Sequence, residues 1–121
     1  MSIVVQASMD VPVREKCRWI KDLFDLKDVE MAHILNISVE TLRNWLHDGR
    51  DTHAVDSVRF HRLLSLAQLA KGVIRAEKMG HWLHAENKAL GDLVPAHLLA
   101  NPAGYRLVAG VVEDLRSGIS D

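Results

Sequence analysis

Residues 28–45, DVEMAHILNISVETLRNW, constrain the fold of this chain more than any other stretch. Their pattern predicts two short helices joined by a tight turn. Asp28 and Ser38 are favoured N-cap residues, and each stands where an apolar helical periodicity begins. Asn36, which tolerates the left-handed backbone conformation, stands between the two predicted helices. We therefore expect a close helical pair in which the small residue Ala32 allows the second helix to approach the first.

The same stretch resembles the helix-turn-helix of DNA-binding repressors. The resemblance is carried by Ala32, Leu35, Asn36 (where that family most often has Gly), Ile37, Ser38, Leu42 and Trp45. In that geometry the second helix enters the major groove, where Arg reads guanine, Asn reads adenine and Glu accepts from cytosine. The candidate DNA-binding residues are Val39, Glu40, Thr41, Arg43, Asn44 and His47, with Lys27 and Arg50 at the edges. The alternative is an ordinary helical hairpin with a solvated polar face.

The charge of the chain argues against strong DNA binding by one subunit. The net charge is -1, whereas phosphate contacts usually require a basic excess. Residues 28–48 carry Asp28, Glu30, Glu40 and Asp48 against Arg43 alone. We therefore expect a symmetric homodimer that reads two half-sites. The further basic residues best placed to help are Lys27, Arg50, Arg59 and Arg62.

The rest of the chain is also helical in pattern. Val13, Cys17, Ile20 and Phe24 recur at helical spacing after Pro12, and a loop is predicted at 49–56. A long helix is predicted from about Ser57 to Lys78, with Gly80 ending or kinking it. Its apolar stripe is wide enough to predict burial against the chain's own C-terminal region and against a second subunit. A short helix at 96–99 and a last helix from Asn101-Pro102 to Leu115, stopped by Ser117-Gly118, complete the prediction.

The segment 63–118 is similar to the toxin-binding domain of Xre/MbcA/ParS-type antitoxins. The matching residues are Trp82-Leu83, Ala89-Leu90-Gly91, Pro95, Leu98-Leu99, Asn101-Pro102-Ala103-Gly104-Tyr105, and the helix carrying Val108, Val111, Val112 and Leu115. Two positions depart from the family: Asp92 stands where Gly is common, and Val94 stands where Ser or Thr precedes the Pro. Because Val94 cannot cap the short helix, we expect Asp92 to cap it by another geometry.

The resemblance implies an antitoxin that works beside a RES-domain toxin, which degrades NAD. In such pairs the C-terminal region of the antitoxin covers the toxin's active site, and the complex represses its own operon. The expected fold is all-α, with a DNA-binding region at 1–53 joined by the long helix to a toxin-binding and dimerisation region at 54–121. The candidate toxin-binding residues are Arg106, Glu113, Asp114, Arg116, Ser117, Gly118, Ile119, Ser120 and Asp121. Each of them is equally consistent with a solvated helix face.

Other functions find little support in the sequence. His81 and His84 could share a helical face with Glu77 or His97, but three or four converging metal ligands are not evident. Cys17 is the single cysteine, which predicts a buried thiol and a cytoplasmic protein. We expect no catalysis, no cofactor and no membrane span. Two rivals stay open: a dimeric transcriptional regulator without a toxin, and a pure protein inhibitor that no longer binds DNA.

Overall fold

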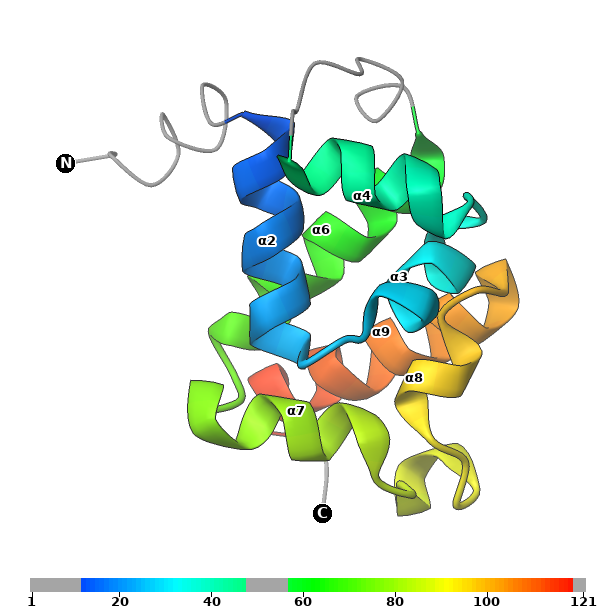
Figure 1. Cartoon of the computed structure of the whole chain (residues 1–121). Helices are drawn as coiled ribbons and strands as arrows, with labels where there is room; N and C mark the ends of the chain where they lie inside the picture. Colours follow the sequence, from blue (N-terminus) through cyan, green and yellow to red (C-terminus); the bar gives the residue numbers. More distant parts are fainter. Residues whose placement is uncertain (1–11, 48–56, 119–121) are drawn as a thin grey trace, which may run out of the picture.

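The structure, a computed structural model, describes residues 12–47 and 57–118. In these ranges it contains seven α-helices, one 3-10 helix and no strand, so the predicted all-α class is confirmed (Figure 1). The elements are α2 (Val13–Phe24), α3 (Asp28–Leu35), α4 (Val39–His47), α6 (Val58–Lys71), α7 (Ala76–His84), η1 (Lys88–Leu90), α8 (Pro95–Leu98) and α9 (Pro102–Ser117). No helix in the described ranges has the length and apolar character needed to cross a membrane.

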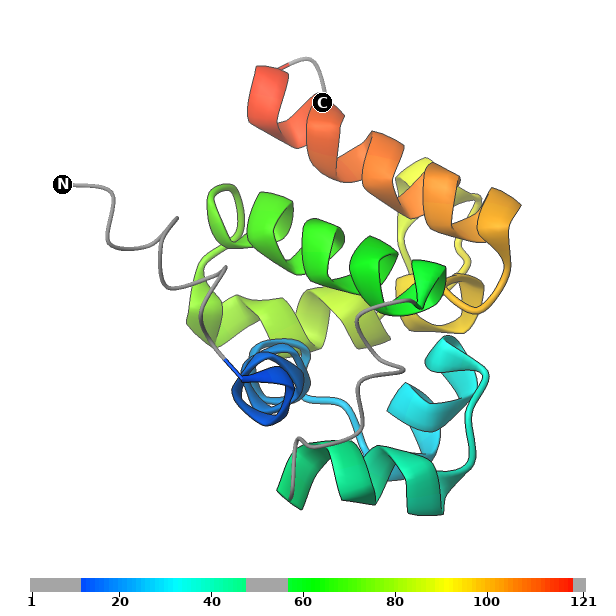
Figure 2. The same cartoon turned by 90° about the horizontal axis from the view of Figure 1, so that it is seen from above.

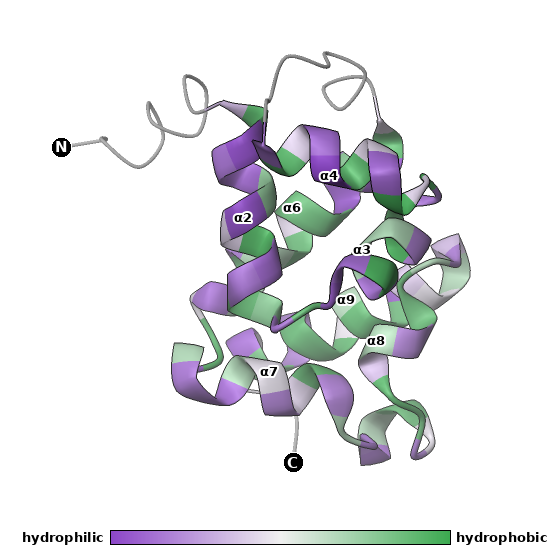
Figure 3. Ribbon diagram, in the orientation of Figure 1, coloured by the Kyte–Doolittle hydropathy of each residue, from purple (hydrophilic) through white to green (hydrophobic). Residues whose placement is uncertain are grey.

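Helix α2 is strongly amphipathic. Val13, Cys17, Ile20 and Phe24 are buried, as their spacing predicted. The opposite face carries charged side chains and is coloured as hydrophilic in Figure 3. Helix α2 packs against α4, α6 and α7, so its apolar face connects both halves of the chain.

The turn between α3 and α4 has the predicted form. Asn36 adopts the left-handed conformation, with φ 56° and ψ 46°. Its N–H donates to the carbonyl of His33, and the N–H of Ile37 donates to the carbonyl of Ala32 at 3.0 Å. These bonds satisfy carbonyl groups at the end of α3. Ala32 is 2% exposed, which accords with its predicted place between the helices.

The predicted N-cap of α3 was wrong by one residue. Lys27 occupies the N-cap position, and its N–H donates to Glu30 Oε1 at 3.0 Å. Asp28 is the first residue of the helix itself. Its carboxylate faces cations on α2 and α4, so tertiary contacts, not helix capping, determine where this side chain points.

The predicted long helix is two helices. Helix α6 ends at Lys71, and α7 begins at Ala76 after a turn that contains Gly72. The apolar stripe continued across this turn because Val73 and Ile74 also pack on the core. Periodicity therefore could not separate one helix from two. Gly72, which is unfavourable inside a helix, was the signal for the break.

Gly80 does not end a helix, as one of the two predicted alternatives had it; it lies inside α7. A Cβ at this position would stand 2.9 Å from Asp25 Cβ. Asp25 is the left-handed residue that ends α2, with φ 51°. The absence of a side chain at Gly80 thus lets α7 cross close to the end of α2.

Helix α6 lies between the α2–α4 group and α9, and Figure 2 shows α6 and α9 side by side. Its inward residues are Phe60, Leu63, Leu66, Ala67 and Ala70. The helix contacts α2 and α3 as well as α9. The width of its apolar stripe is therefore explained by contacts within one chain. The homodimer stays a prediction that rests on the charge argument alone.

The C-terminal segment is fixed by local caps. Asn101 Oδ1 accepts from the N–H groups of Ala103 at 2.8 Å and Gly104 at 3.2 Å, which confirms the predicted start of α9. Gly118 ends this helix in the left-handed conformation, with φ 71°. Asp92 does not cap α8, since no side chain does; its carboxylate lies 3.7 Å from Lys88 Nζ. Pro95 at the start of α8 has no N–H that would require a cap.

A single cluster of buried side chains includes residues from α2, α3, α4, α6, α7, α8 and α9. Trp45 of α4 meets Phe60 of α6 edge to face, with ring centroids 6.1 Å apart. The two predicted regions therefore share one core in the described ranges. Their proposed boundary at residues 53 and 54 lies outside the described residues and stays a prediction.

Candidate functional site

Helix α4 presents one polar face to solvent because its other face is held by the core. Leu42, Trp45 and Leu46 are buried. Ser38 Oγ accepts from the N–H of Thr41 at 3.0 Å, which confirms Ser38 as the N-cap. The turn at Asn36 and this cap together fix the direction in which α4 leaves α3.

The predicted DNA-binding residues divide into two groups. Glu40, Arg43, Asn44, His47 and Lys27 are exposed. Val39 is partly buried against the core, and the Thr41 hydroxyl bonds to Ser38 Oγ at 2.9 Å, so these two side chains are less available. Arg50 lies outside the described residues. Glu40, Arg43, Asn44 and His47 share one face of α4, whereas Lys27 precedes α3.

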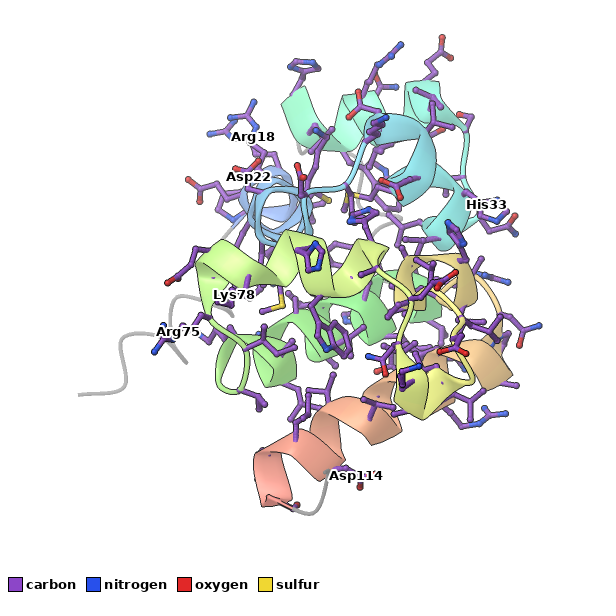
Figure 4. All side chains as sticks on the ribbon, turned by 90° about the horizontal axis from the view of Figure 1, so that it is seen from below. Arg18, Asp22, His33, Arg75, Lys78 and Asp114 are labelled. Atoms are coloured by element: carbon purple, nitrogen blue, oxygen red, sulfur yellow. The ribbon has the colours of Figure 1, made fainter. Side chains whose placement is uncertain are left out.

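A groove of about 360 Å³ runs between α2 and α4 beside this surface. Its lining is Arg18, Lys21, Asp22, Asp28, Arg43, Leu46 and His47. Figure 4 labels Arg18 and Asp22, which project from α2 on this side of the molecule. Three permanent cations against two carboxylates give the groove a local positive balance that the net charge of the chain conceals.

Arg18 and Lys21 were missed as candidate binding residues in the sequence. With Arg14 they stand at positions 14, 18 and 21, which is the spacing of one helical face. Each of these positions follows a buried residue of α2 by one, so the basic face lies about 100° around the helix from the apolar face, and the signal was present. The packing of α2 against α4 was needed to show that this face lies beside Arg43.

Asp28 forms ion pairs with two of the cations in the groove. Its Oδ1 lies 3.5 Å from Lys21 Nζ, and its Oδ2 lies 3.4 Å from Arg43 Nε. The Arg43 side chain is nevertheless 60% exposed, so it stays accessible to a ligand. The arrangement joins α2, α3 and α4 at one point.

The last helix, α9, supplies the other candidate surface. Arg106, Asp114, Arg116, Ser117 and Gly118 are exposed, and Glu113 is partly buried; Ile119, Ser120 and Asp121 lie outside the described residues. Arg116 donates to Glu113 Oε1 from Nη2 at 2.6 Å and from Nε at 2.9 Å. These two charges are thus paired with each other in the free chain.

Leu107 is a further member of this surface that the sequence reasoning missed. It is 57% exposed, although its neighbours Val108, Val111 and Val112 are buried. Leu107 stands three residues after Gly104 and four before Val111, which is the spacing of an inward face, so periodicity gave no signal of its exposure. Gly110 is exposed next to it along the helix, and an added Cβ there would meet nothing within 4 Å.

Close packing holds α9 against α8. A Cβ at Gly104 would lie 2.2 Å from the carbonyl oxygen of Leu98, so only glycine fits there. Arg59 of α6 donates from Nη1 to the carbonyl of Ala100, which ties the turn after α8 to the core. Burial raises the pKa of Tyr105 above its ordinary value, and the positive charge of Arg62 opposes this shift. Arg59 therefore helps to hold α6 against the turn after α8.

The residues that carried the antitoxin resemblance mostly build this part of the fold. Leu90, Pro95 and Leu99 are buried, while Trp82, Leu98 and Tyr105 are partly buried against the core. These side chains therefore contribute to the core of this part of the chain.

A second groove, of about 630 Å³, lies between the start of α3 and α7. Its lining includes Lys27, Glu30, His81 and His84. His84 bonds through Nδ1 to the carbonyl of Gly80 at 2.8 Å and through Nε2 to Glu30 Oε2 at 2.9 Å. The described residues contain no group of three or more His, Cys, Asp or Glu side chains that could hold a metal ion. His84 instead connects α7 to α3.

The two candidate surfaces lie on opposite sides of the molecule. In Figures 2 and 4, α2 and α4 stand at one side and α9 at the other, with α6 between them. Asp114, labelled in Figure 4, projects from α9 far from Arg18. A macromolecule bound to one of these surfaces would leave the other surface free.

No family model matches this sequence, and no curated protein matches it. The fold is similar to that of a chain in the crystal structure of the M. tuberculosis MbcT-MbcA toxin-antitoxin complex, with a TM-score of 0.67 and 16% sequence identity. The match covers 89% of this chain and 96% of that chain. The similarity in fold thus extends over nearly the whole of both chains.

Proposed function

We propose that this chain is an antitoxin that binds and neutralises a partner toxin and represses its own operon. The observation that carries the proposal is the similarity in fold, over 89% of the chain, to a protein solved within a toxin-antitoxin complex. The residues that carry the sequence resemblance build the part of the fold that supports α9. Two separate polar surfaces suit a protein with two partners.

The proposed toxin-binding surface is the outer face of α9 and the tail that follows it. Leu107 supplies an exposed apolar group, Arg106 and Asp114 are exposed charged groups of the same helix, and Arg116 is exposed near its end. An apolar anchor surrounded by polar groups is the usual composition of a protein interface. The proposed partner is a toxin of the RES-domain type, whose NAD-binding cleft this surface would close. The chemistry belongs to the toxin, and this chain acts as an inhibitor without catalysis.

The proposed DNA-binding surface is α4 with the adjoining groove. Arg43, Asn44 and His47 are exposed on the helix that would enter the major groove. Arg18 and Lys21 add cations that can contact the phosphate backbone. A homodimer would place two such surfaces on the two half-sites of the operator. The second surface would compensate for the small positive charge of the first.

Neutralisation tests the toxin part of the proposal. We expect the chain to co-purify with a toxin encoded beside it and to rescue growth of cells that express that toxin. Leu107→Glu should abolish rescue, because it places an unpaired charge at the centre of the interface. Val29→Glu is the matched control, since Val29 is 68% exposed and lies on α3, which packs against α4 and α6. Equal rescue by both variants would remove the outer face of α9 from the interface.

Two rivals have distinct outcomes. A plain transcriptional regulator would bind the upstream promoter but co-purify with no toxin. A pure protein inhibitor would neutralise the toxin without shifting promoter DNA, and the pairing of Arg43 with Asp28 is the observation that favours this rival. A gel shift on the upstream promoter at low salt, repeated with Arg43→Ala, separates it from the operon repressor.

A further inference from the structure

Asp28, the first residue of α3, faces cations that come from two other helices. Lys21 Nζ of α2 lies 3.5 Å from one carboxylate oxygen, and Arg43 Nε of α4 lies 3.4 Å from the other. The side chains of Lys21, Asp28 and Arg43 are 30%, 29% and 60% exposed. Water therefore reaches both pairs, and exposed pairs of this kind are weak. Another anion can exchange with Asp28 at this position.

The groove around these pairs is open and of the right charge for an anion. Its volume is about 360 Å³, and Arg18 and His47 extend its polar lining beyond the two pairs. Asp22 is the only other carboxylate among its described lining residues. A phosphodiester carries one negative charge, as the Asp28 carboxylate does. The groove also borders the exposed face of α4, so DNA lying on α4 would bring its backbone here.

We propose that this groove is a phosphate-backbone site and that Asp28 is its internal competitor. In the free protein the Asp28 carboxylate occupies the position of a DNA phosphate between Lys21 and Arg43. On binding, the two cations exchange Asp28 for phosphate, and Asp28 is left beside the backbone without its partners. The inference rests on the proposed DNA-binding function and assigns a mechanism of regulation to that surface.

The competition has a consequence for specificity. On arbitrary DNA the Arg43 guanidinium gives up Asp28 for a phosphate, so one ion pair replaces another with little gain in affinity. Only a site that also offers base contacts to α4 adds an interaction that Asp28 does not supply. The carboxylate therefore suppresses non-specific binding more than operator binding.

The test uses the full chain and two fluorescently labelled duplexes of equal length, one from the region upstream of its gene and one of arbitrary sequence. Asp28→Asn keeps the shape of the side chain and removes its charge. It should tighten binding to the arbitrary duplex by roughly three- to tenfold at low salt and steepen the salt dependence by about one unit of slope. The affinity for the operator duplex should rise less, so the ratio of operator affinity to affinity for the arbitrary duplex should fall.

Asp22→Asn is the matched control. It removes the same charge from the same groove, but no ion pair of the Asp22 side chain is present among the described residues. General electrostatics predicts equal gains for the two variants, whereas competition at Lys21 and Arg43 predicts a gain below about twofold for Asp22→Asn. In an Arg43→Ala background Asp28→Asn should raise the affinity for the arbitrary duplex by less, because the Arg43 cation for which Asp28 and phosphate compete is absent.

Several results would overturn the inference while the operator-binding function stood. These are unchanged or weaker binding by Asp28→Asn at an unchanged melting temperature, equal gains from both Asn variants, and an undiminished gain in the Arg43→Ala background. If inorganic phosphate at millimolar concentration displaced Asp28 but no duplex did, the groove would be a small-anion site. Failure of every variant to bind either duplex at low salt would overturn the DNA-binding function and this inference with it.

Discussion

Cys17 shows how burial at one residue sets its chemistry. The side chain is fully buried on the inward face of α2, between Val13 and Ile20. This burial raises the pKa of the thiol from 9.0 to about 12, because the charged thiolate would lose its hydration. The thiol therefore stays neutral and behaves as a small apolar group, as the sequence predicted. The reactive form is available only when the chain unfolds.

The Cys17 thiol should make stability depend on pH in alkaline solution. Between about pH 9 and about 12 the unfolded thiol has lost its proton while the folded thiol has kept it. The unfolded state then binds fewer protons, so the free energy of unfolding falls as pH rises, by at most roughly 1.4 kcal/mol per pH unit from this group. Urea unfolding of the parent and of Cys17→Ala measures the difference in slope. Parallel slopes above pH 9 would contradict the burial of the thiol.

At the scale of elements, two glycines of α9 have opposite roles. Gly104 is buried where the helix begins, and the carbonyl of Leu98 occupies the space that a side chain would need. Gly110 lies on the exposed face of the same helix with nothing near it. The first glycine permits the contact between α8 and α9, whereas the second only lowers the helix propensity of α9.

Alanine substitution should therefore change stability in opposite directions at these two positions. Gly104→Ala should lower the free energy of unfolding by about 1–3 kcal/mol, because α9 must move away from α8. Gly110→Ala should raise it by about 0.5–1 kcal/mol through helix propensity. Chemical denaturation of both variants gives the comparison directly. A neutral Gly104→Ala would show that α8 and α9 are further apart than the structure places them.

The end of α9 should matter more for neutralisation than for folding. Arg116, Ser117 and Gly118 are exposed, and the ion pair between Arg116 and Glu113 is on the surface. Truncation after Leu115 should lower the melting temperature only slightly, since exposed pairs contribute about 1 kcal/mol or less. It should nevertheless impair protection against the toxin. Full protection by the truncated chain would exclude the tail from the inhibitory surface.

On the scale of the whole molecule, one core supports two surfaces that face opposite ways. Helix α6 contacts α2, α3 and α9, so it separates α4 from the outer face of α9 (Figure 2). The shared cluster of buried side chains fixes both surfaces in one body. Substitutions of exposed residues on one surface should consequently leave the other surface intact.

Arg43→Ala and Asn44→Ala test this separation. Each should weaken operator binding by about 1–3 kcal/mol, because each removes a side chain that can read a base edge. Neutralisation of the toxin should be unchanged, since both residues lie on α4. Gel shifts and a growth-rescue assay on the same proteins measure the two activities. Loss of rescue in either variant would show that the toxin also contacts α4.

The sequence by itself determined the features that depend on neighbours within one or two helical turns. The all-α class, the left-handed turn at Asn36, the caps at Ser38 and Asn101 and the inward face of α2 all follow from such local signals. Their physical basis is backbone hydrogen bonding and apolar periodicity, which act over a few residues.

Only the tertiary structure decided where distant segments meet. It put Gly80 against Asp25, and it made Asp28 the partner of Lys21 and Arg43 and not a helix cap. These outcomes depend on which helix faces lie together, and a one-dimensional pattern does not contain that information. The groove beside α4 is the clearest case, because its cations come from segments more than twenty residues apart.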